Sequence, residues 1–131
     1  MQELTVGSQS VVKSSSPNSI YVPEKGDIVW IDFNPQSGRE QAGRRPALVV
    51  SPTPYNRRVK LAIVCPITTK VKGYPFEIAL PDTLLVHGVV LADQVKSLDF
   101  RTCKAELACK LPDEVLVQVV ARIANLPVNE T

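Results

Sequence analysis

Short runs of hydrophobic residues, alternating or continuous, occupy most of the chain. Residues 27–33 are mostly β-branched or aromatic and are followed by a turn-forming Asn-Pro pair, so they predict a strand. Residues 45–51 form a nearly continuous apolar run, which predicts a strand buried on both faces. Residues 60–68 predict a third strand, in which Pro66 requires a bulge, an edge position or the end of the strand. Further short strands are expected at residues 76–80, 88–92, 94–97 and 104–109.

The hydrophobic spacing changes to a helical period near the end of the chain. The apolar residues with three- and four-residue spacing are Leu116, Val119, Val120, Ile123 and Leu126. They form the stripe of an amphipathic helix, for which Pro112 suits the first turn and Pro127 the end. Residues 52–58 are expected to form a turn or a short helix. Many short strands followed by one helix predict a mainly β fold, in which a strongly curved, barrel-like sheet carries a C-terminal α-helix.

At 131 residues, the chain has room for one well-filled domain. Residues 1–20 are polar and lack periodicity, so we expect a flexible N-terminal extension there. The folded domain is expected at residues 21–127 and a short C-terminal tail at 128–131. No apolar run approaches the roughly 18 residues of a membrane span, and the beginning lacks the apolar segment of a secretory signal. We therefore expect a cytoplasmic protein.

Three cysteines and one histidine leave little scope for metal chemistry. No two cysteines form a C-x-x-C pair, so a zinc site would lack ligands, and we expect neither a metal nor an organic cofactor. The odd number of cysteines predicts reduced thiols that serve as small buried hydrophobic residues.

Positive charge is concentrated in the middle of the chain. Residues 38–74 contain eight cations and one anion, a local charge of +7, whereas the whole chain carries only +2. The remainder is therefore net negative by five. Such an asymmetry suits a polyanionic partner, although a solvated surface would explain it equally well.

One loop in this basic region predicts a site for phosphate chemistry. Residues 36–44 form a connection longer than hairpins usually need, and long loops in compact domains tend to be functional. Arg45 follows it and adjoins Pro46, which stiffens the backbone at the start of a predicted strand. A guanidinium fixed there can bind a phosphate through two donors. Glu40 lies five residues earlier in the same loop.

Four motifs resemble the MazF/PemK (Kid) family of toxin endoribonucleases, and its MazF branch most closely. The motifs are GDIVWIDFNP at residues 26–35, GREQAGRRPA at 38–47, PITT at 66–69 followed by KGYPFE at 72–77, and GVVLADQVKS at 88–97. They occur in the family's order over residues 21–126. The combination is specific, whereas a lone Arg-Pro pair would carry no information.

The resemblance implies an SH3-like, plasmid-maintenance-toxin barrel that forms a homodimer. It implies metal-independent cleavage of single-stranded RNA at short sequences, and inhibition by a cognate MazE-like antitoxin. The family's catalytic arginine maps to Arg45, its catalytic threonine to Thr68 and its loop glutamate to Glu40.

These residue types suit cleavage by the RNA's own 2′-hydroxyl, which needs deprotonation, charge stabilisation at phosphorus and protonation of the leaving oxygen. We assign Arg45 to the developing negative charge, Thr68 to a phosphate oxygen and Glu40 to the 2′-hydroxyl proton. The expected products are a 2′,3′-cyclic phosphate and a free 5′-hydroxyl, and DNA is expected to resist because it lacks the attacking group.

Other residues are expected to contact RNA, each with a solvated surface role as the alternative. They are Arg39, Gln41, Arg44, Arg57, Lys70, Lys72, Asp93 and Gln94. Trp30 is expected in the core or at a dimer contact, with base stacking as the alternative. His87 lies outside the family's motifs, and we expect it to be exposed to solvent.

Two other functions remain open from sequence alone. A toxin of the same fold could inhibit DNA gyrase, as CcdB-type toxins do, but such a binder would have no use for a phosphate-directed Arg45. A non-catalytic RNA- or protein-binding barrel would explain the basic region equally well.

Overall fold

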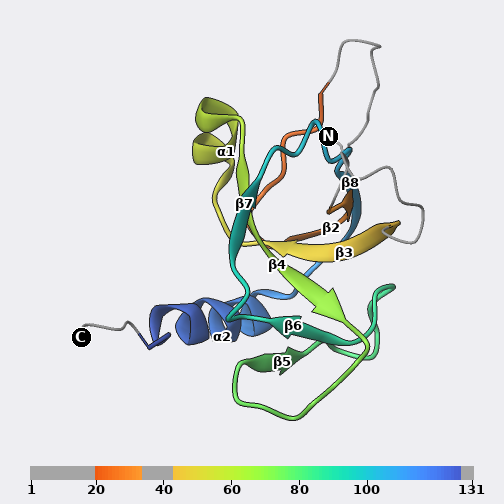
Figure 1. The fold of residues 1–131 in the computed structure, drawn as a ribbon, viewed down its shortest axis with the longest axis vertical. Coiled ribbons are helices and arrows are strands. Elements are labelled where there is room, and N and C mark those ends of the chain that lie inside the picture. Colours follow the sequence, from red (N-terminus) through yellow and green to blue (C-terminus); the bar gives the residue numbers. More distant parts are fainter. Residues whose placement is uncertain (1–19, 34–42, 128–131) are drawn as a thin grey trace, which may run out of the picture.

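A computed structural model describes residues 20–33 and 43–127, which form one curved antiparallel sheet with two helices (Figure 1). The strands are β2 (Asp27–Asp32), β3 (Arg44–Val49), β4 (Ala62–Thr68), β5 (Glu77–Ala79), β6 (Val89–Leu91), β7 (Lys96–Leu98) and β8 (Glu106–Lys110). The helices are α1 (Thr53–Val59) and α2 (Asp113–Ala124). The strand order is β5-β6-β4-β3-β2-β8, and β7 pairs with β4 outside this path. The predicted mainly β fold with a C-terminal helix is confirmed.

The central strand β3 is buried on both faces along its second half, as predicted. Leu48 lies in a core with Ile28 of β2 and Val119 of α2, each fully buried. Its neighbours Ala47 and Val49 face the opposite core, which contains Phe100. The first residues of β3 are exposed, because the strand emerges there at the edge of the cores. β3 therefore carries its N-terminal side chains from the surface into the interior.

Two prolines lie within strands without breaking the sheet. Pro66 occupies the gap where β4 changes its outer partner, from β7 at Ala62–Val64 to β6 at Ile67–Thr68. Pro46 precedes the stretch in which β3 pairs with β4, which begins at Ala47. A proline cannot donate to a ladder, and each of these two has a strand partner on one side only: Pro46 lies opposite Trp30 and Pro66 opposite Ala47. The sequence predicted a bulge, an edge position or a strand end at Pro66, and the structure has a change of partner strand there.

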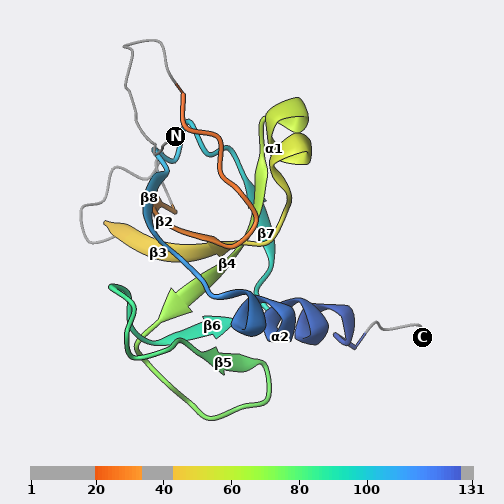
Figure 2. The ribbon, with the colours of Figure 1, turned by 180° about the vertical axis from the view of Figure 1, so that it is seen from behind.

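The last helix begins slightly later and ends slightly earlier than its sequence predicts. Pro112, expected in the first turn, is the N-cap of α2, and the helix ends at Ala124. Figure 2 shows α2 alongside β6 at one end of the sheet. Its apolar stripe faces the first core through Val119, while Leu116 and Ile123 pack at the edge of that core.

The beginning of β2 is held by a buried carboxylate. Asp27 is 1% exposed and accepts hydrogen bonds from the Tyr21 hydroxyl, from Glu24 N at 3.0 Å and from Lys110 Nζ at 2.7 Å. Burial and the hydrogen bond to Asp27 raise the pKa of Tyr21. A buried charge needs such partners, so this network joins β2, β8 and the entering chain.

Candidate functional site

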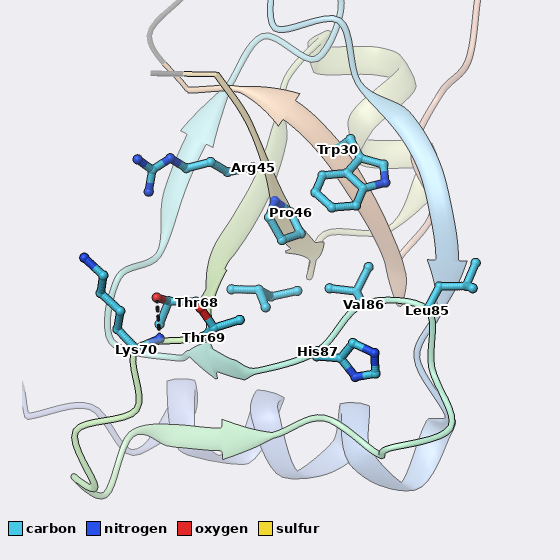
Figure 3. Close-up of a pocket in the computed structure, with 10 residues that line it drawn as sticks. Trp30, Arg45, Pro46, Thr68, Thr69, Lys70, Leu85, Val86 and His87 are labelled. Atoms are coloured by element: carbon cyan, nitrogen blue, oxygen red, sulfur yellow. Dashed lines mark hydrogen bonds between the residues drawn. The ribbon is translucent and has the colours of Figure 1, made fainter. Parts of the chain in front are cut away.

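Arg45 of β3 and Thr68 of β4 line the same open pocket, which has a volume of about 490 Å³ (Figure 3). The pairing of β3 with β4 explains why they meet. Ala47 lies opposite Pro66 in this antiparallel ladder, so the same register continued by two residues brings Arg45 opposite Thr68. Residues two apart in a strand share a face. The two side chains therefore project from neighbouring strand ends on one face of the sheet.

The pocket has two chemically different walls. The cationic wall consists of Arg45, Lys70 and the hydroxyl-bearing Thr68 and Thr69. The aromatic wall consists of Trp30, Leu85, Val86 and His87, and Pro46 and Ile67 complete the lining. Figure 3 shows Arg45 and Lys70 on one side of Pro46, and Trp30, Leu85 and His87 on the other. Such a pocket can hold an anion against one wall and a flat apolar group against the other.

The hydroxyl group of Thr68 is oriented by the backbone. Lys70 N donates a hydrogen bond to Thr68 Oγ1 at 3.0 Å, which Figure 3 draws as a dashed line. A hydroxyl that accepts one bond keeps its own hydrogen for another acceptor. Thr68 is thus prepared to donate into the pocket.

A smaller pocket of about 140 Å³ adjoins the first, and both include Thr68 and Lys70. Its other lining residues are Lys72, Tyr74, Glu77, Leu91 and Gln94. The Glu77 carboxylate accepts hydrogen bonds from Lys72 N at 3.0 Å and Gly73 N at 2.7 Å, which holds the loop before β5 in place. Two adjoining pockets that share a cationic and a hydroxyl-bearing residue suit a chain of linked anionic units.

The structure brings together five of the predicted site residues: Arg45, Thr68, Lys70, Lys72 and Gln94 line the two pockets. Arg57 lines a separate pocket of about 90 Å³ with Phe100 and Arg101. Asp93 lines none of these three pockets. Arg39, Glu40 and Gln41 lie outside the described residues.

The guanidinium of Arg44, another predicted RNA contact, is bonded within the protein. It donates to Asp32 and Glu106 side chains and to the Trp30 and Lys104 carbonyl oxygens. Arg44 is absent from the residues that line either pocket.

The aromatic wall is the part of the site that the sequence reasoning largely missed. His87 is exposed, as predicted, but it also lines the pocket. Leu85 is 79% exposed and Trp30 is 38% exposed, so neither is a core residue. The signal that could have revealed this wall is Gly88, which has φ +122° and whose added Cβ would lie 2.3 Å from the Thr68 carbonyl oxygen. Only glycine allows the segment that carries His87 to approach Thr68 so closely.

The cysteines lie apart from the residues that line these pockets. Burial, with a contribution from the negative charge of Asp93, raises the pKa of Cys65 to about 12. Burial also raises the pKa of Cys103. Both are free thiols held in their protonated form, so they act as small hydrophobic residues. Within residues 20–33 and 43–127, no three potential metal-ligating side chains converge.

None of the helices in the described part of the chain is long and apolar enough to cross a membrane.

Comparison with known proteins relates this chain to one family. Residues 24–126 match the family model described as "PemK-like, MazF-like toxin of type II toxin-antitoxin system". The endoribonuclease toxin MazF of Escherichia coli K12 is 46% identical over 105 residues, covering 80% of this chain and 94% of the relative.

Two solved structures from Deinococcus radiodurans share the fold. One is MazF, with a TM-score of 0.72 and 50% identity over 80% of this chain and 96% of that chain. The other is a MazE–MazF complex, with a TM-score of 0.72 and 46% identity over 80% of this chain and 94% of the matched chain. This likeness confirms the barrel fold that the motifs imply.

Proposed function

This chain belongs to the family of PemK-like, MazF-like toxins of type II toxin-antitoxin systems, and from that premise we propose that it is an endoribonuclease that cleaves single-stranded RNA in the pocket around Arg45 and Thr68. The observation that carries the proposal is that these two side chains line one pocket, together with Lys70. The relatives' names, which include endoribonuclease and MazF, support the same activity over the gyrase-directed and non-catalytic alternatives.

The cationic wall provides what cleavage by the RNA's 2′-hydroxyl requires. Arg45 stabilises the charge that develops on the phosphorane, since a guanidinium remains protonated and offers two parallel donors to phosphate oxygens. Thr68 donates its hydroxyl hydrogen to a phosphate oxygen, because its oxygen already accepts from Lys70 N. Donors that are fixed before the reaction cost no reorganisation during it. The loop residue Glu40, outside the described residues, remains our candidate for the base that removes the 2′-hydroxyl proton.

The aromatic wall receives the base of a nucleotide that adjoins the scissile phosphate. Trp30 and His87 offer flat surfaces, and Leu85 adds exposed apolar area. Stacking of a base on an aromatic side chain contributes about 1–3 kcal/mol to binding. The smaller pocket, with Lys72, Tyr74 and Gln94, is suited to the next nucleotide.

The proposal extends to two protein partners and a location. A MazE-like antitoxin is expected to bind and inhibit the chain, since a structure of its D. radiodurans relative is titled as a MazE–MazF complex. A homodimer is expected from the family resemblance. We expect the toxin to act in the cytoplasm, where messenger RNA is found.

The test is incubation of the purified protein with a long RNA in excess EDTA, followed by analysis of the product ends. We expect cuts that leave a 2′,3′-cyclic phosphate and a 5′-hydroxyl, and no cutting of DNA of the same sequence. Loss of one donor to the developing charge typically lowers the rate by about 100- to 1,000-fold, so Arg45→Ala and Thr68→Val should both be nearly inactive. Thr68→Ser keeps the hydroxyl and should retain most of the activity. Equal cleavage of an RNA with a 2′-deoxy sugar upstream of the break would disprove the mechanism.

A further inference from the structure

We propose that Arg44 is a positioning residue, which sets the place of Arg45 and of the aromatic wall and does not itself bind RNA. This inference rests on the proposed endoribonuclease function. Its basis is a set of four hydrogen bonds from one guanidinium, which we call the Arg44 clamp. Nη1 donates to Asp32 Oδ1 at 3.1 Å. Nη2 donates to Trp30 O at 3.0 Å, Lys104 O at 2.6 Å and Glu106 Oε1 at 3.1 Å.

The clamp connects three adjacent strands at the end of the sheet nearest the pocket. Arg44 is the first residue of β3 and lies opposite Asp32, the last residue of β2. Beyond β2, Trp30 lies opposite Glu106 of β8. A single side chain from β3 therefore reaches across β2 to β8 and to the turn that contains Lys104.

Both walls of the pocket depend on this side chain. Arg45, in the cationic wall, follows Arg44 directly, and neighbouring strand residues point to opposite faces. Holding Arg44 on one face thus fixes Arg45 on the other. Trp30, in the aromatic wall, has its carbonyl oxygen bonded to the same Nη2 atom. The clamp therefore sets the separation of the two groups that would hold phosphate and base.

Only a guanidinium can make this connection. Two carbonyl oxygens and two carboxylates surround it, and they need several donors spread in a plane. A lysine carries its charge on one nitrogen, whereas the guanidinium reaches Asp32 from Nη1 and the other three acceptors from Nη2, which are held in a fixed plane. The two ion pairs are partly exposed, with the Glu106 side chain 73% accessible, so charge alone contributes little. The bonds to the Trp30 and Lys104 backbone provide the geometry.

The first experiment separates catalysis from binding. Arg44→Gln and Arg44→Lys are compared with the wild type in single-turnover cleavage of one RNA, and in affinity for that RNA with a 2′-deoxy sugar at the break. A displacement of about 1 Å can cost about 100-fold in rate. We expect both variants to lose about 10- to 100-fold in rate, with affinity and its salt dependence within about twofold of wild type. Lysine should not rescue the rate.

An RNA contact would give the opposite pattern. Affinity would fall in Arg44→Gln, the slope of log affinity against log salt would decrease by about 0.7, and Arg44→Lys would restore both. That result, or an unchanged cleavage rate in Arg44→Gln, would overturn the inference. Inactive wild-type protein would instead refute the proposed function on which it rests.

A second variant leaves Arg44 in place and removes one of its acceptors. Asp32→Ala should slow cleavage if the clamp positions Arg45. If Arg44 were instead a phosphate contact, its release from Asp32 should leave the variant binding RNA at least as tightly as the wild type. Trp30 is the only tryptophan in the chain, so its fluorescence reports on the aromatic wall. We expect acrylamide to quench it more strongly in Arg44→Gln and Asp32→Ala than in wild type. Unchanged quenching in both variants would contradict a role for the clamp in holding that wall.

Discussion

Arg45 and Thr68 show how little a residue's type reveals until its neighbours are known. Arginine and threonine are ordinary surface residues, and each acquires a candidate role from a backbone constraint. Thr68 has its oxygen occupied by Lys70 N, so its hydrogen is left to donate. Arg45 lies between the clamped Arg44 and the rigid Pro46. Both side chains therefore meet a substrate with less freedom to lose than exposed residues usually have.

The thiol of Cys65 predicts a loss of stability in alkaline solution. Its pKa is raised from 9.0 to about 12 in the folded protein, mainly by burial. Between these values the unfolded chain releases a proton that the folded chain keeps. The contribution of Cys65 to the free energy of unfolding is therefore fully present below pH 9. It is lost as the pH rises above 9, at about 1.4 kcal/mol for each pH unit. Urea unfolding at pH 8, 9 and 10 measures this slope.

The matched variant is Cys65→Ala, which removes the titrating group. It should be less stable than wild type at pH 8, because a buried side chain is truncated. Its stability should nevertheless decline less steeply between pH 9 and 10. Cys103 also has a raised pKa and would contribute in the same direction in both proteins. Parallel curves for wild type and variant would show that Cys65 does not titrate differently on folding.

At the scale of elements, the site depends on the close contact between the segment before β6 and the end of β4. A Cβ at Gly88 would lie 2.3 Å from the Thr68 carbonyl oxygen and 2.8 Å from its carbon, at a φ of +122°. These are backbone atoms, so the strands themselves must move. We expect Gly88→Ala to cost about 3 kcal/mol or more in the free energy of unfolding and to abolish cleavage, measured by urea denaturation and RNA digestion.

Gly73→Ala is the control for the strain of a positive φ alone. Gly73 has φ +85°, but an added Cβ there would meet nothing within 4 Å. We expect this substitution to cost about 1–2 kcal/mol, as an alanine in left-handed backbone does, and to leave cleavage measurable. Equal losses of stability and cleavage in the two variants would mean that the close approach of Gly88 to Thr68 adds nothing to the strain of a positive φ.

The elements themselves were largely predictable, because local patterns determine them. Each predicted strand is present, and the shifts at their ends have local causes. β4 begins at Ala62, two residues late, because Lys60 ends α1 in the left-handed conformation. β7 begins at Lys96 because a turn occupies the residues before it, with Gln94 N bonded to the Leu91 carbonyl oxygen.

The candidate site was predictable where side chains act through their own chemistry. Arg45 and Thr68 carry recognisable functional groups near strand ends, and the fold brings them together in one pocket. For Arg44, an RNA contact stays a prediction, and the bonds that led us to propose a positioning role come from residues up to 62 positions away. His87 and Leu85 belong to a segment without a motif, and only its contact with Thr68 gives them a place in the pocket. Long-range packing is the information that a single sequence lacks.

For the whole molecule, the basic stretch at residues 38–74 is continuous in sequence, but the structure places its cations at separate pockets. Lys70 and Lys72 lie at the two adjoining pockets. Arg57 and Lys60 line a different pocket beside Phe100 and Arg101. A nucleic acid bound at Arg45 would therefore meet the first pair directly. The net charge of +2 for the whole chain gives no indication that these cations lie at separate pockets.

The salt dependence of RNA binding tests which of these cations follow the substrate. Each phosphate contact on a single strand contributes about −0.7 to the slope of log affinity against log salt, through the release of condensed ions. The double variant Lys70→Gln/Lys72→Gln should reduce the magnitude of this slope by about 1.4, and Arg57→Gln/Lys60→Gln, which removes the same charge, should leave it unchanged. Equal reductions in both would mean that the RNA wraps from the β4 end to α1, because a general loss of positive potential would be screened within about 10 Å at moderate salt.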